Sequence, residues 1–133
     1  MNKLTPQKLG NYDIIERLGH GGMAEVYKGH HSTLDRLVAI KVLHRHLSDT
    51  QDLIERFKLE ARAIAKLQHP HIMRLIDFDA QGDEFYMVLE YLDGGNLKAY
   101  LKQEGTLPPQ EALRLAAQLL SGLDYAHRQG MIH

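Results

Sequence analysis

The sequence predicts an α+β fold, in which a five-stranded antiparallel sheet carries one packed helix and two further helices follow. Apolar runs rich in β-formers, separated by glycines and charged turns, indicate the strands. Helical spacing of apolar residues between the third and fourth of these runs indicates the packed helix. The pair Pro108-Pro109 opens a long stretch rich in leucine and alanine, which is typical of a helix start.

The strands follow a short tail at residues 1–11. Tyr12 to Leu18 is expected to form the first strand, and residues 81–84, with the sequence Gln-Gly-Asp-Glu, are expected to form a hairpin turn. The other expected strands are Ala24 to His30, Arg36 to Leu43, Ile72 to Phe78 and Phe85 to Tyr91.

The packed helix is expected from Asp52 through Leu67, with Glu60 on its inward face. Apolar residues lie three or four positions on either side of that carboxylate. A second, short helix is expected from Asn96 to Glu104, with Asn96 as its N-cap. The third should run from Pro109 to about Arg128. Its leucines cover more than one face, so we expect an exposed apolar patch and self-association of the chain.

A glycine-rich segment, Gly19 to Val26, precedes the apolar run Val38-Ala39-Ile40-Lys41. The residues between them read as strand, loop and strand, and a Rossmann dinucleotide site would need a helix there. No Walker A string occurs. The remaining phosphate-binding device is a glycine-rich hairpin folded over ATP. An ordinary hairpin turn with a solvated lysine is the alternative.

Glu60 needs a cation because an acidic side chain on a packed face is unfavourable without one. Lys41 is the candidate, since it ends an apolar strand and can reach phosphate oxygens as a point charge. Local helical pairing of Glu60 with Arg56 or Lys66 is the alternative.

These features resemble the protein kinase family, specifically the Ser/Thr kinases of the eukaryotic-like type found in bacteria. The resemblance extends over the strings Arg56 to Ala61, Leu67 to Ile72 and Phe85 to Gly95. It implies that residues 12–93 are the kinase small lobe and hinge, and that residues 94–133 begin the large lobe. Lys41 and Glu60 match the paired catalytic lysine and glutamate of the family.

The resemblance also implies a set of ATP contacts. The glycine-rich loop would cover the phosphates, while the adenine ring would be sandwiched by Leu18, Val26 and Ala39. The backbone carbonyl of Glu90 and the backbone amide of Leu92 would hydrogen-bond adenine. The loop residues of this set are Gly19, His20, Gly21, Gly22, Met23, Ala24, Glu25 and Val26. Ala24 stands where the commonest pattern has a third glycine.

His133 matches the histidine that opens the His-Arg-Asp catalytic loop of the family. We therefore expect this chain to be an N-terminal fragment without the catalytic Asp and the magnesium ligands, inactive alone although the full-length enzyme would use ATP and Mg²⁺ to phosphorylate proteins. The resemblance also implies a hydrophobic spine with Ile64, Leu75 and His133 as members and without its fourth member, the Phe of an Asp-Phe-Gly motif. This incomplete spine predicts a loose Lys41–Glu60 pair. The alternatives are a non-catalytic nucleotide-binding or kinase-docking module and, less favoured, a small-molecule phosphotransferase.

Composition is typical of an intracellular globular protein. The chain has no cysteine, and its formal charge of −1 at pH 7 argues against nucleic-acid binding. We expect a cytoplasmic location, with any membrane anchor of the full-length protein downstream. Nine histidines invite a zinc interpretation, but they lack cysteine partners and a His-Glu-x-x-His helix. We expect no metal site among them.

Overall fold

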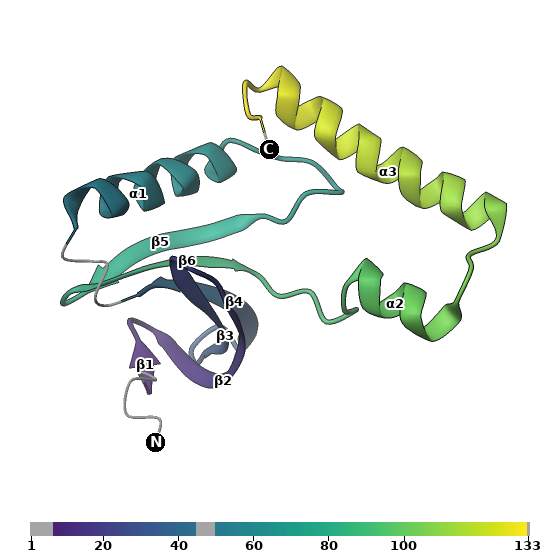
Figure 1. Ribbon diagram of the computed structural model, residues 1–133. Helices are drawn as coiled ribbons and strands as arrows, with labels where there is room; N and C mark the ends of the chain where they lie inside the picture. Colours follow the sequence, from purple (N-terminus) through teal and green to yellow (C-terminus); the bar gives the residue numbers. More distant parts are fainter. Residues whose placement is uncertain (1–6, 45–49, 133) are drawn as a thin grey trace. The chain divides into compact units, whose positions relative to one another are not determined.

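The computed structural model describes residues 7–44 and 50–132, so His133 lies outside the described residues (Figure 1). The chain divides into two compact units. The first contains the described residues of Met1–Ala65 together with Arg74–Tyr91, and the second contains those of Lys66–Met73 and Leu92–His133. The sequence-based division after residue 93 treats the first part as continuous, whereas Lys66–Met73 groups with the second unit.

The first unit is built on an antiparallel sheet of six strands in the order β1-β2-β3-β4-β6-β5. The fold class is confirmed, with one strand more than expected. That strand is β1, within the expected tail, where Leu9 pairs with Tyr12 across a turn at Gly10 and Asn11. The strands are β1 (Lys8–Leu9), β2 (Tyr12–His20), β3 (Ala24–His31), β4 (Arg36–Leu43), β5 (Leu75–Gln81) and β6 (Glu84–Glu90).

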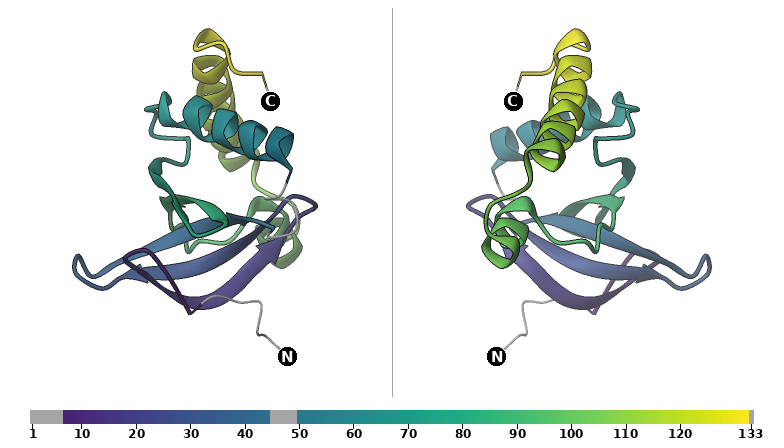
Figure 2. Two further views of the ribbon diagram at one scale, coloured as in Figure 1. Left: turned by 90° about the vertical axis from the view of Figure 1, so that its left-hand side faces the viewer. Right: turned by 90° about the vertical axis from the view of Figure 1, so that its right-hand side faces the viewer.

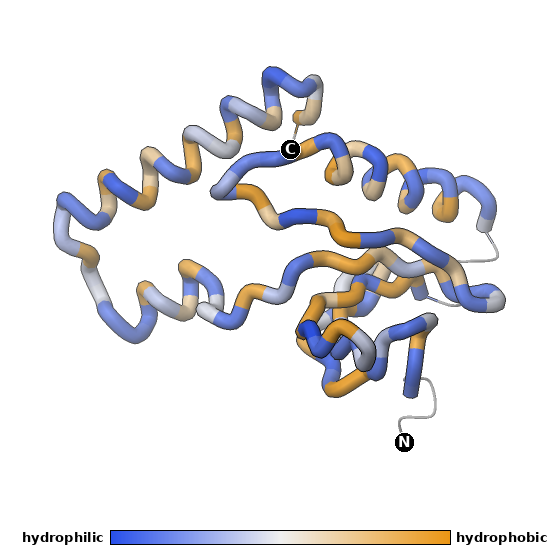
Figure 3. Tube along the Cα trace, turned by 180° about the vertical axis from the view of Figure 1, so that it is seen from behind, coloured by the Kyte–Doolittle hydropathy of each residue, from blue (hydrophilic) through white to orange (hydrophobic). Residues whose placement is uncertain are grey.

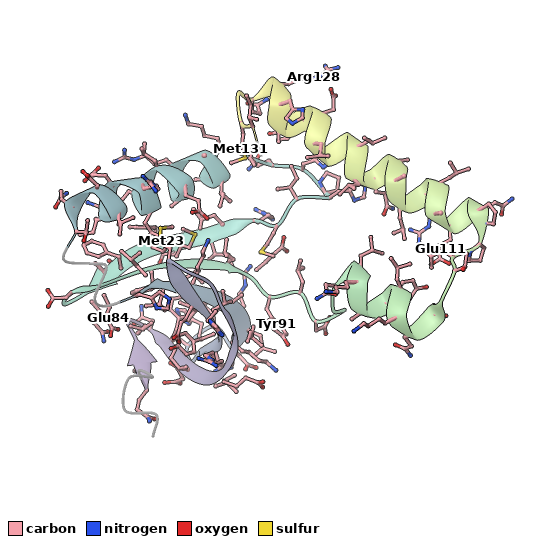
Figure 4. All side chains as sticks on the ribbon, in the orientation of Figure 1. Met23, Glu84, Tyr91, Glu111, Arg128 and Met131 are labelled. Carbon is pink, nitrogen blue, oxygen red and sulfur yellow. The ribbon has the colours of Figure 1, made fainter. Side chains whose placement is uncertain are left out.

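Helix α1 (Gln51–Ala65) packs on one face of this sheet, as the side views in Figure 2 show. Side chains alternate between the two faces of a strand, so β4 contributes to both sides. Leu43 lies on the helix side, in a cluster with Phe57 and Met87 at 0% exposure. Figure 4 labels Met23, which packs against the same cluster from the β2–β3 turn.

The other face of the sheet buries a second apolar cluster. Its members from β4 are Val38, Ile40 and Val42, which alternate with the residues on the helix side. Tyr86 of β6 and Leu9 of β1 also belong to it. Apolar burial on both faces therefore explains why β4 reads as a nearly continuous apolar run.

The buried phenol of Tyr86 should make the first unit less stable at alkaline pH. Burial raises the pKa of Tyr86 to about 12, and the carboxylates of Asp79 and Asp77 add to the effect. Between pH 10 and 12 the unfolded chain releases this proton and the folded chain keeps it. The contribution of Tyr86 to stability is therefore fully present below pH 10 and is lost as the pH rises. The loss attributable to this group is about 2 to 3 kcal/mol.

Urea unfolding between pH 9 and 12 measures this loss. Tyr86→Phe should show a shallower decline of unfolding free energy with pH than the wild type, because the variant lacks the ionising hydroxyl. Equal slopes in the two proteins would contradict the expectation. Tyr12, whose pKa burial also raises, is present in both proteins and contributes to both slopes.

The second unit contains helix α2 (Leu97–Glu104), helix α3 (Pro109–Arg128) and the loop of residues 66–73. The expected N-cap is confirmed, since the Asn96 side chain accepts a hydrogen bond of 2.8 Å from the Ala99 amide. Tyr100 of α2 donates a hydrogen bond of 2.8 Å to Glu111 of α3, which Figure 4 labels.

The loop of residues 66–73 packs along α3. The amide of Gln68 donates to the Tyr125 hydroxyl at 3.1 Å, and His69 Nε2 lies 3.1 Å from Ser121 Oγ. A Cβ on Gly122 would lie 3.4 Å from the His71 carbonyl oxygen, so glycine lets the loop approach the helix closely. Because the loop is held here, the strand expected from Ile72 begins only at Leu75.

Helix α3 exposes several of its apolar side chains, and Figure 3 shows hydrophobic and hydrophilic residues alternating along it. Leu113 is 70% exposed, and Leu119 and Leu120 are each 63% exposed. Self-association through this surface stays a prediction. Within the described residues, no helix combines the length and the apolar character that crossing a membrane requires.

Candidate functional site

The glycine-rich segment forms the hairpin between β2 and β3. Gly19 pairs with Val26 and His20 pairs with Glu25, while the Gly21 amide donates to the Ala24 carbonyl at 2.8 Å. Gly22 and Met23 therefore occupy the tip of a two-residue turn. The expected strand, loop and strand order around the glycines is confirmed.

The loop glycines are not required by the packing of the described residues. A Cβ added to Gly19 or Gly22 would meet no atom within 4 Å, and one added to Gly21 would come no closer than 3.9 Å to another atom. By contrast, a Cβ on Gly10 would lie 2.5 Å from the Tyr86 hydroxyl oxygen. The loop therefore leaves open space where a ligand could approach the backbone closely.

Lys41 lies on β4 and contacts Glu60 of α1 directly. Lys41 Nζ donates to Glu60 Oε1 at 2.7 Å, and their side chains are 28% and 35% exposed. Of the two partners considered for Glu60, the structure therefore supports the distant lysine over its helical neighbours. Both groups stay accessible to solvent, so the lysine can meet an anion while the carboxylate orients it.

The expectation of a loose Lys41–Glu60 pair is wrong. Phe57 and Ala61, which flank Glu60 on α1, are 0% and 4% exposed in the cluster against the sheet. Phe57 also packs on Phe78 of β5, with ring centroids 5.7 Å apart. These contacts lie within the first unit and hold α1 against the sheet.

The residues expected around adenine lie on several strands. Val26 pairs with Lys41 across β3 and β4, and Ala39 lies two residues before Lys41, so all three share one face of the sheet. Leu18, 45% exposed, stands at a bulge between Arg17 and Gly19.

The two expected hinge residues fall in different units. Glu90 ends β6 opposite Val38, and its amide donates to the Arg74 carbonyl at 3.0 Å. Leu92 belongs to the second unit. The first unit thus brings together Val26, Ala39, Lys41 and Glu60 beside the glycine-rich loop.

His44 is a site residue that sequence reasoning missed. Its Nε2 lies 2.9 Å from the Gly21 carbonyl oxygen, and its backbone amide donates to the Met23 carbonyl at 2.9 Å. In the structure, extending the register of Ala24 with Leu43 by one residue places His44 opposite Met23.

Metal ligands do not gather in this region. Across residues 7–44 and 50–132, no three His, Cys, Asp or Glu side chains lie close enough to hold an ion together. The site instead provides the cation of Lys41, the carboxylate of Glu60 and the backbone of the open glycine-rich loop. This combination suits a phosphate-bearing ligand.

The sequence was compared with protein families and with known proteins, and the matches agree with one another. The sequence pattern of the family described as "Protein kinase domain" matches residues 12–133. The chain is 39% identical over 124 residues to the serine/threonine-protein kinase PrkC of Bacillus subtilis, covering 93% of this chain and 19% of PrkC. It is 43% identical over 123 residues to the probable serine/threonine-protein kinase PknB of Lactococcus lactis, covering 92% and 20% of the two chains.

Solved structures agree with the sequence comparisons. The crystal structure of the PknI kinase domain from Mycobacterium tuberculosis superposes with a TM-score of 0.74 at 28% identity, covering 95% of this chain and 52% of that one. The chain thus spans about a fifth of the two curated relatives and about half of this solved domain.

Proposed function

The chain belongs to the protein kinase family, and on that premise we propose that it binds ATP beneath the glycine-rich loop. The phosphates would lie between the loop tip and Lys41, and adenine would lie against Leu18, Val26 and Ala39. Glu90 and Leu92 would contact adenine through their backbones. The observation that carries the proposal is the 2.7 Å contact of Lys41 with Glu60, on the sheet face that also presents Val26.

The open space at the loop glycines supports the same proposal. Glycine inside a strand, such as Gly19 in β2, reduces stability relative to alanine by roughly 0.5–1 kcal/mol, so its use where a Cβ would fit needs another reason. Close approach of phosphate oxygens to backbone amides is such a reason, because a Cβ would increase that distance.

We propose further that the whole protein transfers the γ-phosphoryl group of ATP to Ser or Thr hydroxyls of proteins. The hydroxyl oxygen would form the new bond to phosphorus as the bond to ADP breaks, and its proton would pass to a base. Mg²⁺ would accompany ATP and neutralise developing charge. The described residues would contribute phosphate binding through the loop and Lys41, while Glu60 orients the lysine.

A loop variant tests the ATP proposal. Gly22→Val should fold normally, since a Cβ there meets no atom within 4 Å, but its side chain should obstruct the phosphates. We expect calorimetry to show ATP and ADP affinity reduced about tenfold or more, a loss of at least 1.4 kcal/mol, with little change for adenosine.

Adenosine is the matched control because it keeps the ring and lacks the phosphates. Equal losses for all three ligands would mean that the substitution disturbs the whole unit. Unchanged ATP affinity in a folded Gly22→Val protein would contradict phosphate binding at this loop.

A further inference from the structure

His44 contacts both carbonyl oxygens that flank the tip of the glycine-rich loop. Its ring nitrogen Nε2 lies 2.9 Å from the Gly21 oxygen, and its backbone amide donates to the Met23 oxygen at 2.9 Å. A carbonyl oxygen can only accept, so Nε2 carries the proton in this contact. One residue at the end of β4 thereby fixes two peptide groups in the neighbouring hairpin.

The orientation of these peptide groups matters for an anionic ligand. In a planar trans peptide the C=O and the next N–H point in opposite directions. Holding the Gly21 oxygen on His44 therefore directs the Gly22 amide away from His44. Carbonyl oxygens carry partial negative charge and would repel a phosphate, whereas an amide hydrogen would bind it.

An acidic side chain of the loop lies near the other nitrogen of the His44 ring. Glu25 Oε1 lies 4.0 Å from His44 Nδ1, on the side of the ring away from the Gly21 contact. The Tyr27 hydroxyl donates to Glu25 Oε2 at 2.6 Å, and Arg17 lies 3.8 Å from Oε1. Tyr27 is only 4% exposed, so this carboxylate is anchored to the buried part of the sheet.

We propose that His44 is a positioning residue for nucleotide binding, which holds the loop tip so that its amides are preset toward the phosphates. The inference rests on the proposed ATP site. His44 need not touch the nucleotide itself. Its effect would arise because a preset loop loses less conformational entropy when the ligand binds.

Two readouts on the same 133-residue chain test the inference. The first is the backbone ¹⁵N relaxation of Gly21, Gly22 and Met23 without ligand, and the second is calorimetric affinity for ATP and adenosine. The variants are His44→Leu, which removes the ring donor, His44→Gln, which restores a side-chain donor, and His127→Leu as a histidine control on α3.

We expect His44→Leu to increase fast motion at the loop tip and to raise the Kd for ATP about fivefold, the equivalent of one net hydrogen bond. The Kd for adenosine should change less than twofold. His44→Gln should recover part of both effects, and His127→Leu should show neither. Recovery by glutamine distinguishes lost positioning from lost packing.

The outcomes separate this inference from the ATP proposal. If the wild type fails to bind ATP while His44→Leu still mobilises the loop tip, the proposed function is overturned and the positioning of the loop by His44 stands. If the loop tip of a folded His44→Leu protein is as rigid as in the wild type, the inference is overturned. It is equally overturned if the loop becomes mobile and a wild type that binds ATP loses no affinity.

Discussion

Lys41→Met is expected to weaken ATP binding at least tenfold while the first unit stays folded. A hydrogen bond to a charged group contributes about 1.5–3 kcal/mol, which corresponds to roughly a tenfold to hundredfold change in affinity. The methionine side chain is unbranched like that of lysine, is one atom shorter, and cannot donate to phosphate oxygens. Stability should change by about 1 kcal/mol or less, because both partners of the Lys41–Glu60 pair are partly exposed.

The control is Lys8→Met, which removes the same charge from β1. Lys8 Nζ lies 4.0 Å from an Asp13 oxygen, so it also has a carboxylate partner, but that pair is more exposed. Calorimetric titration of ATP into both variants compares their losses of affinity. Similar losses in the two proteins would mean that net charge matters and the position of Lys41 does not.

Phe57→Ala is expected to reduce the free energy of unfolding by about 3–5 kcal/mol. The ring of Phe57 is 0% exposed and packs against the sheet between α1 and Phe78. Removing it opens a cavity where the helix meets the strands, and the net stability of a domain is only about 5–15 kcal/mol. Urea unfolding followed by circular dichroism measures the change.

Leu59→Ala is the matched control on the same helix. Leu59 is 59% exposed, so its truncation should change stability by about 0.5 kcal/mol or less. Phe57→Leu, which leaves most of the core filled, should keep the fold and still lower ATP affinity, because Glu60 would lose part of its support. A Phe57→Ala protein as stable as the Leu59→Ala protein would contradict the packing of α1.

The sequence predicted the main strands and helices because most of them carry a local signal. Runs of β-forming residues mark β2 and β3, turn residues mark Gln81 to Glu84, and Asn96 has the side chain that caps a helix. Strand β1 was missed although Gly10 and Asn11 are turn residues, since two residues of strand give no periodicity. It forms because Leu9 is buried against Tyr12 and Tyr86.

The parts of the site that depend on tertiary packing were harder to predict. The spacing on α1 indicated that Glu60 faces inward, and the structure adds the contact with Lys41. The expectation of a loose contact was wrong, because sequence patterns do not show how Phe57 packs the helix against the sheet. The His44 contact depends on a side chain reaching across to a neighbouring hairpin, which no spacing rule describes.

The hydrogen bonds of Gln81 have a consequence for how the chain folds during synthesis. Gln81 accepts from the Gly10 amide and donates to the Lys8 carbonyl, joining positions 71 and 73 residues apart. One edge of strand β4 likewise stays unpaired until β6 has been synthesised, since Val38 pairs with Glu90. On the ribosome, β4 therefore presents an apolar, unpaired edge until β6 has emerged, a nascent state that is slow to fold and open to aggregation.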